Sequence, residues 1–218
     1  MLLEKERKAI IRFGQKLVTS NLTTGTGGNL SLANRRKNLV AISPSGIDYF
    51  ETRPQDVVLT NMDGDIQDGQ RKPSSELSFH LELYRARADI QAVVHTHSVY
   101  ATTIACLRWE IPAVHYLVGF SGNKVPLAPY ATFGTQELAR NVARAIGPYN
   151  AVLLANHGLV TVGPNMAAAF TTAEEIEFVA RLYYQSKGIG QPEILPDPEM
   201  EIIVEKFKTY GQKMKTGG

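Results

Sequence analysis

The chain has 218 residues, of which 44% are hydrophobic and 20% charged, so it can bury a sizeable core and is most simply one domain. Its formal net charge of +2 is too small to indicate nucleic acid or a membrane surface as the main partner. The single cysteine excludes an internal disulfide framework, no apolar run reaches the roughly 18 residues of a spanning helix, and the N-terminus is acidic, so we expect a cytoplasmic protein.

The first part of the chain predicts one helix followed by short strands. Apolar residues recur at helical spacing over residues 4–20 and predict an amphipathic helix. Residues 30–43 predict a hairpin whose basic tip we expect to be solvated, and residues 56–60 predict another strand. The Asp-x-Asp pair at residues 63–65 lacks the other ligands of a calcium loop, which favours a plain turn.

The middle of the chain predicts alternating helices and strands. Residues 73–76 read Pro-Ser-Ser-Glu, a helix start with hydroxyls available for capping, and the helix should run to about Arg87. Residues 92–97 predict a strand and residues 98–107 a helix-like segment. Residues 133–147 predict a further helix, which ends at a Gly-Pro pair.

The last part predicts a second pair of strands and two helices. Residues 151–155 are a fully apolar strand candidate, and residues 159–162 form a second strand after a turn. A long helix follows over residues 166–187, and we expect residues 189–218 to be a linker with a mobile C-terminal helix and tail. Because strands and helices are intermixed, residues 1–218 predict a single-domain α/β/α sandwich, with a central, mainly antiparallel sheet covered by helices.

Three of the five histidines lie at strand ends or turns. Alternate side chains of a strand share one face, so His95 and His97 form half of a first-row metal site. His157 follows an apolar strand and can reach the same face if the two strands are neighbours. Glu76, at the predicted helix start, is our candidate for the fourth ligand. Three imidazoles and a carboxylate suit Zn²⁺ best, with Mn²⁺, Co²⁺ or Fe²⁺ as alternatives.

Another interpretation is that these histidines are simply hydrogen-bonded polar groups at strand ends. His80, four residues after Glu76, could replace one ligand, but its apolar neighbours favour a buried histidine with one hydrogen bond. Cys106 lies in an apolar segment, where we expect it to be packed and inert.

A second group of stretches is rich in small and hydroxyl-bearing residues, namely residues 25–29, 43–46 and 74–75. Each can present backbone N–H groups, hydroxyls or a helix N-terminus to an anion. Neither glycine-rich nucleotide-binding fingerprint is complete. Together with a metal, these stretches predict a phosphate pocket that works with little formal charge.

Eight ordered motifs resemble those of the class II, zinc-dependent aldolase/epimerase family. The motifs are residues 27–29, 43–46, 73–76, 95–97, 111–116, 128–135, 156–158 and 206–211. A His-x-His pair alone would be weak, but the ordered set is specific and extends over about residues 5–211. Ser45 stands where threonine is common in the family, a change that keeps the hydroxyl.

The resemblance implies a role for each matching position. His95, His97 and His157 would bind Zn²⁺, with Glu76 as the fourth ligand of the resting enzyme. The residues that would hold a substrate phosphate are Gly28, Asn29, Ser45, Gly46, Ser74 and Ser75. Tyr116 and Tyr210 would serve the aldehyde half of the substrate, and in a homotetramer with active sites between subunits they would act on a neighbour's zinc.

The resemblance also implies the reaction, a reversible retro-aldol cleavage of a phosphorylated ketose. The expected substrate is L-fuculose 1-phosphate or a related deoxyketose 1-phosphate, and the products are dihydroxyacetone phosphate and L-lactaldehyde. The metal would stabilise the negative charge left when the C3–C4 bond breaks, while Glu76 exchanges the C3 proton and Tyr116 serves the C4 hydroxyl. Two alternatives are an enzyme similar to L-ribulose-5-phosphate 4-epimerase and a non-catalytic zinc-binding protein.

Overall fold

A mixed sheet forms the middle layer of the computed structural model, which describes residues 1–209. Within those residues the sheet has eight strands in the order β4-β3-β2-β1-β5-β8-β7-β6. The strands are β1 (Asn29–Asn34), β2 (Leu39–Ile42), β3 (Val58–Thr60), β4 (Ile66–Asp68), β5 (Ala92–Thr96), β6 (Leu127–Ala128), β7 (Ala151–Leu154) and β8 (Gly158–Gly163). Neighbouring strands are antiparallel except β6 and β7, which are parallel.

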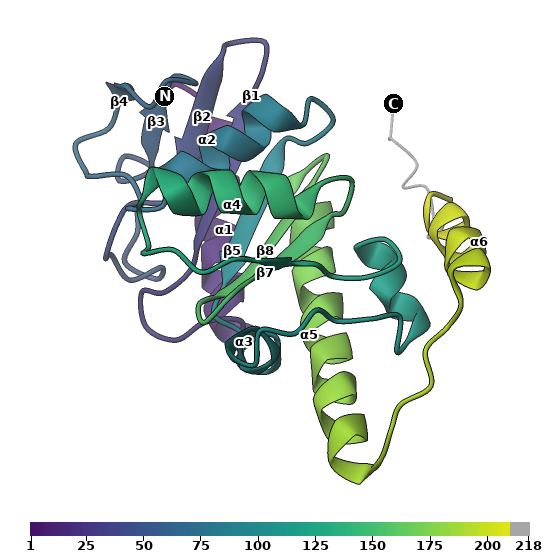
Figure 1. Cartoon of the computed structure of the whole chain (residues 1–218). Helices are drawn as coiled ribbons and strands as arrows, with labels where there is room; N and C mark the ends of the chain where they lie inside the picture. Colours follow the sequence, from purple (N-terminus) through teal and green to yellow (C-terminus); the bar gives the residue numbers. More distant parts are fainter. Residues whose placement is uncertain (210–218) are drawn as a thin grey trace.

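Helices cover both faces of this sheet (Figure 1). They are α1 (Glu4–Thr19), α2 (Leu77–Ala86), α3 (Val99–Cys106), α4 (Gln136–Ile146), α5 (Met166–Ile189) and α6 (Asp197–Phe207), with a 3-10 turn, η1 (Tyr116–Phe120). Side chains of α2 and α4 form one core with the sheet, whereas α1, α3 and α5 pack on the other face. The predicted α/β/α sandwich is therefore confirmed, while the short β6 and η1 were not predicted.

Strand β5 lies in the middle of the sheet, and its alternation decides where the first histidine points. Val93 packs into the core beneath α2 and α4, whereas Ala92 and Val94 pack into the core beneath α1 and α5. His95 shares a face with Val93 because side chains alternate along a strand. Its ring lies 5.6 Å from the ring of Phe79 in α2, so the sheet presents His95 toward that helix.

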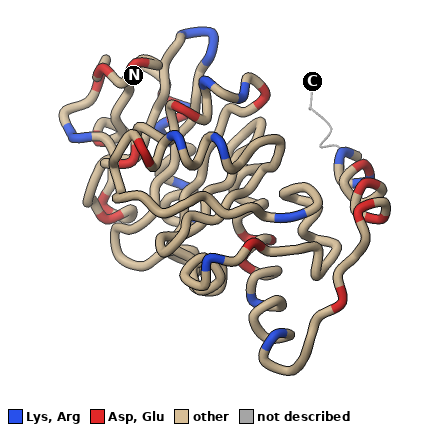
Figure 2. Tube along the Cα trace, viewed as in Figure 1, with Lys and Arg blue, Asp and Glu red and all other residues tan. Residues whose placement is uncertain are grey.

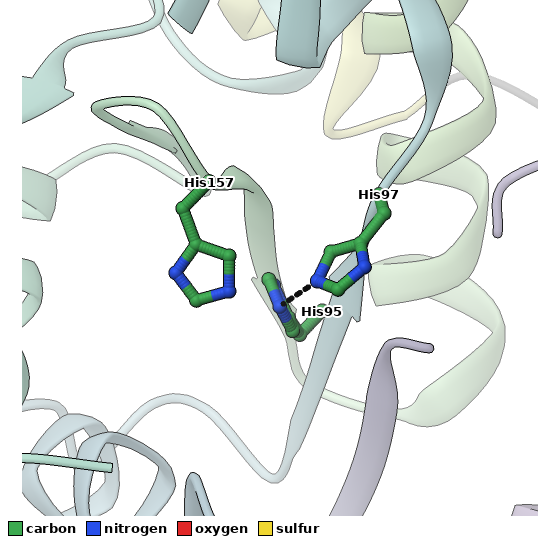
Figure 3. A group of neighbouring side chains, drawn as sticks. All are labelled: His95, His97 and His157. Carbon is green, nitrogen blue, oxygen red and sulfur yellow. Dashed lines mark hydrogen bonds between the residues drawn. The ribbon is translucent and has the colours of Figure 1, made fainter. Parts of the chain in front are cut away.

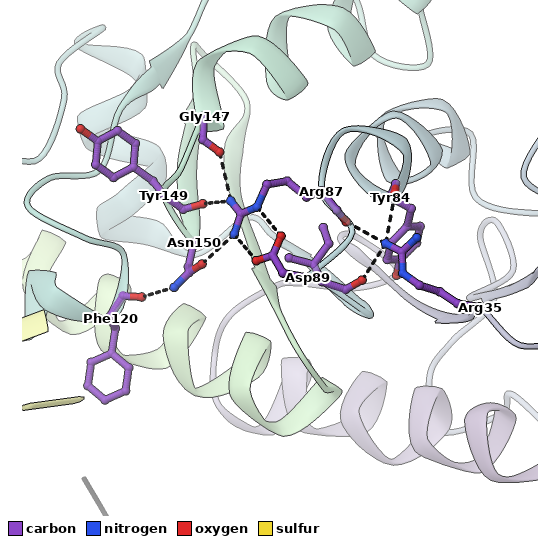
Figure 4. Close-up of polar contacts among 9 residues, drawn as sticks. Arg35, Tyr84, Arg87, Asp89, Phe120, Gly147, Tyr149 and Asn150 are labelled. Carbon is purple, nitrogen blue, oxygen red and sulfur yellow. Dashed lines mark hydrogen bonds and ion pairs between the residues drawn. The ribbon is translucent and has the colours of Figure 1, made fainter. Parts of the chain in front are cut away.

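Two arginines join α2 to the rest of the sandwich (Figure 4). Arg87 follows α2 and donates to the backbone carbonyls of Gly147 at 3.0 Å and Tyr149 at 2.9 Å, while it also pairs with Asp89. Arg35, in the hairpin tip that is exposed as predicted, also donates to three carbonyls around the α2–β5 connection. The tip is therefore part of the structure that fixes α2.

The C-terminal helix packs on the edge of the molecule that carries η1. The ring of Phe207 in α6 lies 4.6 Å from that of Phe120 and 6.2 Å from that of Tyr116. Tyr210, a predicted catalytic residue, lies outside the described residues. Cys106, predicted to be packed, is exposed at the end of α3.

Charges of both signs are spread over the chain, as Figure 2 shows. Within residues 1–209, no helix combines the length and the apolar character needed to cross a bilayer.

Candidate metal centre

Three imidazoles meet where β5 ends and the β7–β8 hairpin turns. His95 is the penultimate residue of β5, His97 follows the strand, and His157 belongs to the hairpin turn. Each offers one nitrogen atom, and these three atoms lie within 4.8 Å of one another. Figure 3 shows the three side chains gathered in one place, and a dashed line joins His95 Nε2 to His97 Nε2. These two nitrogens lie 3.0 Å apart.

The local backbone explains why His157 reaches β5. Asn156 adopts a left-handed conformation, with φ 55, which asparagine tolerates better than most residues. At Gly158 a Cβ atom would lie 2.3 Å from the carbonyl oxygen of Thr96. Because only glycine fits so close to the neighbouring backbone, β8 can pair with β5 here and carry His157 to the other two rings.

The carboxylate of Glu76 lies beside two of the imidazoles. It is the residue that precedes α2, and its side chain is buried. Glu76 Oε2 lies 3.2 Å from His95 Nε2 and accepts a hydrogen bond from Asn29 Nδ2 at 2.9 Å. Glu76 Oε1 lies 3.3 Å from His157 Nε2, and no described residue gives this buried oxygen a hydrogen bond.

These distances fit a tetrahedrally coordinated cation. Ligand bonds of roughly 2.0–2.1 Å place neighbouring ligand atoms about 3.3 Å apart, and three of the separations here are 3.0, 3.2 and 3.3 Å. His95 Nδ1 lies 3.0 Å from the carbonyl oxygen of Leu159, which can only accept. The Nδ1–H group must therefore donate, which turns the lone pair of Nε2 toward the centre, as in many metal-binding histidines.

Burial also favours a bound cation. It lowers the pKa of His95 well below its usual range, with a further contribution from the two nearby imidazoles, and lowers the pKa of His97 and His157. Burial raises the pKa of Glu76, against the opposing effects of His157 and of the Asn29 hydrogen bond. Neutral imidazoles are the form that binds metal, and a divalent cation would supply the positive charge that a buried carboxylate needs.

His80 does not join the group. It is fully buried, with Nδ1 2.6 Å from Ser31 Oγ and Nε2 2.6 Å from Asn29 Oδ1. The buried position agrees with the prediction, but both ring nitrogens are hydrogen-bonded rather than one.

A cavity of about 380 Å³ opens beside the imidazoles. All six predicted phosphate-binding residues line it, together with Glu76, His97 and His157. The six are Gly28, Asn29, Ser45, Gly46, Ser74 and Ser75. No lysine or arginine is among the described residues that line this cavity. Helix α2 begins at its wall without a side-chain cap, so the positive end of the helix dipole is available to an anion.

Three aromatic residues differ in whether they line this cavity. Tyr116 is 49% exposed on η1 and does not line this cavity. Tyr130 and Phe133 do line it, and they were not predicted as site residues. The available signal was a loop rich in proline, glycine and aromatic residues between a strand and a helix.

Known proteins are similar to this chain over nearly its whole length. Residues 8–184 match the model of the family described as Class II Aldolase and Adducin N-terminal domain. The chain is 57% identical to 5-deoxy-D-ribulose 1-phosphate aldolase of Bacillus thuringiensis, over 98% of this chain and all of the relative. It is 38% identical to L-fuculose phosphate aldolase of Escherichia coli, over 97% of this chain and 98% of the relative.

A solved structure of an L-fuculose 1-phosphate aldolase superposes with a TM-score of 0.94 at 48% identity, over 95% of this chain and 98% of that chain. The family match spans most of the chain, and the relatives match it nearly end to end. The chain therefore belongs to the class II aldolase family and is a lyase, as its ordered motifs indicated.

Proposed function

We propose that the chain is a Zn²⁺-dependent aldehyde-lyase that cleaves a deoxyketose 1-phosphate to dihydroxyacetone phosphate and a short aldehyde. The observation that carries this proposal is the convergence of three imidazoles and a buried carboxylate beside a cavity lined by all six phosphate-binding candidates. Mn²⁺, Co²⁺ and Fe²⁺ are the alternative ions for the same ligands.

The phosphate would be held by neutral groups and by the start of α2. The hydroxyls of Ser45, Ser74 and Ser75 can donate to phosphate oxygens, and the backbone at Gly28 and Gly46 borders the same space. The absence of lysine and arginine from the described lining residues leaves hydrogen bonds and the helix dipole to bind the anion.

His95, His97, His157 and Glu76 would hold the metal. When bound, Zn²⁺ supplies Lewis-acid stabilisation of the negative charge that develops when the C3–C4 bond breaks. Glu76 would exchange the proton at C3, since its Oε1 is buried beside the imidazoles and free of hydrogen bonds from the described residues. Tyr116 would handle the proton of the C4 hydroxyl.

For Tyr116 to do so, the active site must lie between subunits. We propose a homotetramer in which Tyr116 and Tyr210 reach the cavity of a neighbouring subunit. The position of Tyr116 supports this assembly, because it is half exposed on η1 and does not line the cavity of its own chain.

Two deoxyketose 1-phosphates are candidates for the substrate. The 57% identity to a 5-deoxy-D-ribulose 1-phosphate aldolase favours that five-carbon sugar, whose C3–C4 cleavage yields acetaldehyde. L-Fuculose 1-phosphate, the substrate predicted from the sequence, would yield L-lactaldehyde and is supported by the solved structure at 48% identity. Tyr130 and Phe133 give the cavity an apolar rim that suits the methyl end of either sugar.

The test is release of dihydroxyacetone phosphate from both sugars and from L-ribulose 5-phosphate, with and without a chelator. We expect release from at least one ketose 1-phosphate, loss of release on chelation, and recovery when Zn²⁺ is restored. Conversion of L-ribulose 5-phosphate to D-xylulose 5-phosphate without free dihydroxyacetone phosphate would favour an epimerase. No reaction with any of the sugars would favour a non-catalytic zinc-binding protein.

A further inference from the structure

Starting at Glu76, buried side chains form one continuous chain of hydrogen bonds that leads from the cavity wall into the core. Asn29 Nδ2 donates to Glu76 Oε2 at 2.9 Å, and Asn29 Oδ1 lies 2.6 Å from His80 Nε2. His80 Nδ1 lies 2.6 Å from Ser31 Oγ, which lies 2.7 Å from the Tyr84 hydroxyl. All five side chains are buried, His80 and Ser31 completely.

The chemistry of these groups gives the chain one direction. An ionised Glu76 can only accept, so the amide nitrogen of Asn29 faces it and the amide oxygen faces His80. His80 must then donate from Nε2 and accept at Nδ1 from the hydroxyl of Ser31. Burial lowers the pKa of His80 to about 3, so at neutral pH the ring carries a single proton.

We propose that His80 is a positioning residue for Glu76. His80 acts through the amide of Asn29, which holds one carboxylate oxygen of Glu76 and leaves the other for the metal and the substrate. This inference rests on the proposed role of Glu76 as metal ligand and proton carrier. It assigns Asn29 a second task besides lining the phosphate cavity, since both polar atoms of its side chain are engaged in the chain of hydrogen bonds.

The orientation of the Asn29 amide explains why a hydrogen-bond donor is needed at position 80. The ring of Phe79 stacks on that of His80 at 4.6 Å, so a leucine could replace the apolar contact. Without the Nε2–H donor, however, the oxygen of Asn29 would be buried with no partner. A rotation of the amide would then place that oxygen against the carboxylate of Glu76, where acceptor faces acceptor. His80 therefore selects the orientation that holds Glu76.

The first measurement uses the wild-type protein loaded with Zn²⁺. Long-range ¹H–¹⁵N correlation spectra assign the tautomer of each histidine without reference to activity. We expect His80 to be neutral and protonated at Nε2. Protonation at Nδ1 instead would overturn the proposal, because His80 could not then donate to Asn29.

The second measurement compares His80→Leu with His80→Gln, whose amide nitrogen can replace the Nε2 donor. We expect His80→Leu to lower kcat about 10-fold to 100-fold with little change in KM, the usual range for partners of a metal ligand. The absorption spectrum of the Co²⁺-loaded protein should change as well. His80→Gln should retain the wild-type spectrum and most of kcat. If His80→Leu does not fold, the proposal is tested by the tautomer of His80 and by the Co²⁺ spectrum and kcat of the His80→Gln variant.

The matched control is Thr161→Val, which removes another fully buried hydrogen bond, from Thr161 Oγ1 to the carbonyl of Ala169 at 2.8 Å. It should lower thermal stability but leave kcat and the Co²⁺ spectrum unchanged. A His80→Leu variant that behaves like this control, or a folded His80→Gln variant as impaired as His80→Leu, would overturn the proposal. Failure of the wild type to cleave any ketose 1-phosphate would instead overturn the proposed function, while the tautomer and the Co²⁺ spectra still test His80.

Discussion

Glu76 lies where burial, two imidazoles and one amide act on the same carboxylate. Its pKa is raised by burial and lowered by His157 and by the hydrogen bond from Asn29. One oxygen is held by the amide, and the other has no hydrogen-bond partner among the described residues. A group with one fixed and one free oxygen can bind a cation in one state and carry a proton in another.

Glu76→Gln tests that role. The neutral amide keeps the shape of the side chain but cannot exchange a proton, so we expect kcat to fall by about 10²-fold to 10⁴-fold in protein that still contains zinc. Zinc content by atomic absorption and the rate of dihydroxyacetone phosphate release are the measurements. Glu82→Gln, on the same helix and paired with Arg85 near the surface, is the control and should retain full activity. A zinc-loaded Glu76→Gln enzyme with unchanged turnover would remove Glu76 from the mechanism.

Gly158 shows how closely the backbone approaches the imidazoles. In Gly158→Ala the new Cβ meets the Thr96 carbonyl, so β8 must shift and we expect the free energy of unfolding to fall by about 1–3 kcal/mol. Zinc affinity should fall as well, since His157 moves with the strand. In the control Gly188→Ala the Cβ meets nothing within 4 Å inside α5, and stability should rise by about 0.5–1 kcal/mol. Urea denaturation measures both, and equal stability of the two variants would contradict the packing argument.

Among the elements, α3 depends on a neighbouring helix for its first turn. Its own N-cap, Ser98, forms no side-chain capping bond to the helix. Glu177 of α5 takes that place, because its carboxylate accepts the backbone N–H groups of Tyr100 at 2.8 Å and Ala101 at 2.9 Å. Since α3 begins two residues after His97, this contact connects α5 to the segment that carries a metal ligand.

We therefore expect Glu177→Ala to lower the free energy of unfolding by about 0.5–2 kcal/mol, the range for loss of a helix cap. It should also weaken zinc binding modestly, because the segment after β5 becomes less constrained. Thermal denaturation and competition with a chelator measure the two effects. Glu175→Ala, on the same helix but away from the first turn of α3, is the control. Equal destabilisation by both variants would show that the capping contact contributes nothing.

In the whole molecule, Tyr116 belongs to a group of exposed aromatic side chains that lies outside the cavity of its own chain. Tyr116 and Phe178 flank His115, with ring centroids 4.7 and 5.9 Å from the His115 ring, and both are about half exposed. Exposed aromatic side chains gathered in this way are typical of a surface that packs against another chain. The proposed tetramer would bury this surface and bring Tyr116 to a neighbouring cavity.

Mixing two inactive variants tests the shared site. Tyr116→Phe and Glu76→Gln chains should each have little activity alone. If every site takes Glu76 from one subunit and Tyr116 from the next, random reassembly of equal amounts should restore about one quarter of the wild-type activity, because half of the subunits can serve each role. The control mixes each variant with itself after the same treatment. No recovery in mixed tetramers would indicate that each site uses residues of a single chain.

Much of the fold and part of the site could be predicted from the sequence. Apolar residues at helical spacing predicted α1, α2 and α4, and alternating or continuous apolar runs predicted β1, β2, β5, β7 and β8. These patterns are reliable because burial of one face imposes a period on each element separately. The His-x-His pair and the Asn-His-Gly turn could be identified from the sequence because the residues of each motif lie close together along the chain. The cytoplasmic location and the roles of Tyr116 and Tyr210 stay predictions.

Only the tertiary structure decided which of these local features meet. Pairing of β5 with β8 brings His157 to His95, and the start of α2 supplies Glu76. Nothing in the sequence indicated that Asn29 would hold Glu76, that His80 would use both ring nitrogens, or that the exposed Arg35 would also donate to backbone carbonyls. A hydrogen bond depends on the position of two groups within a few tenths of an ångström. That position is set by the packing of elements far apart in the chain, whereas periodicity reports only which side of each element is buried.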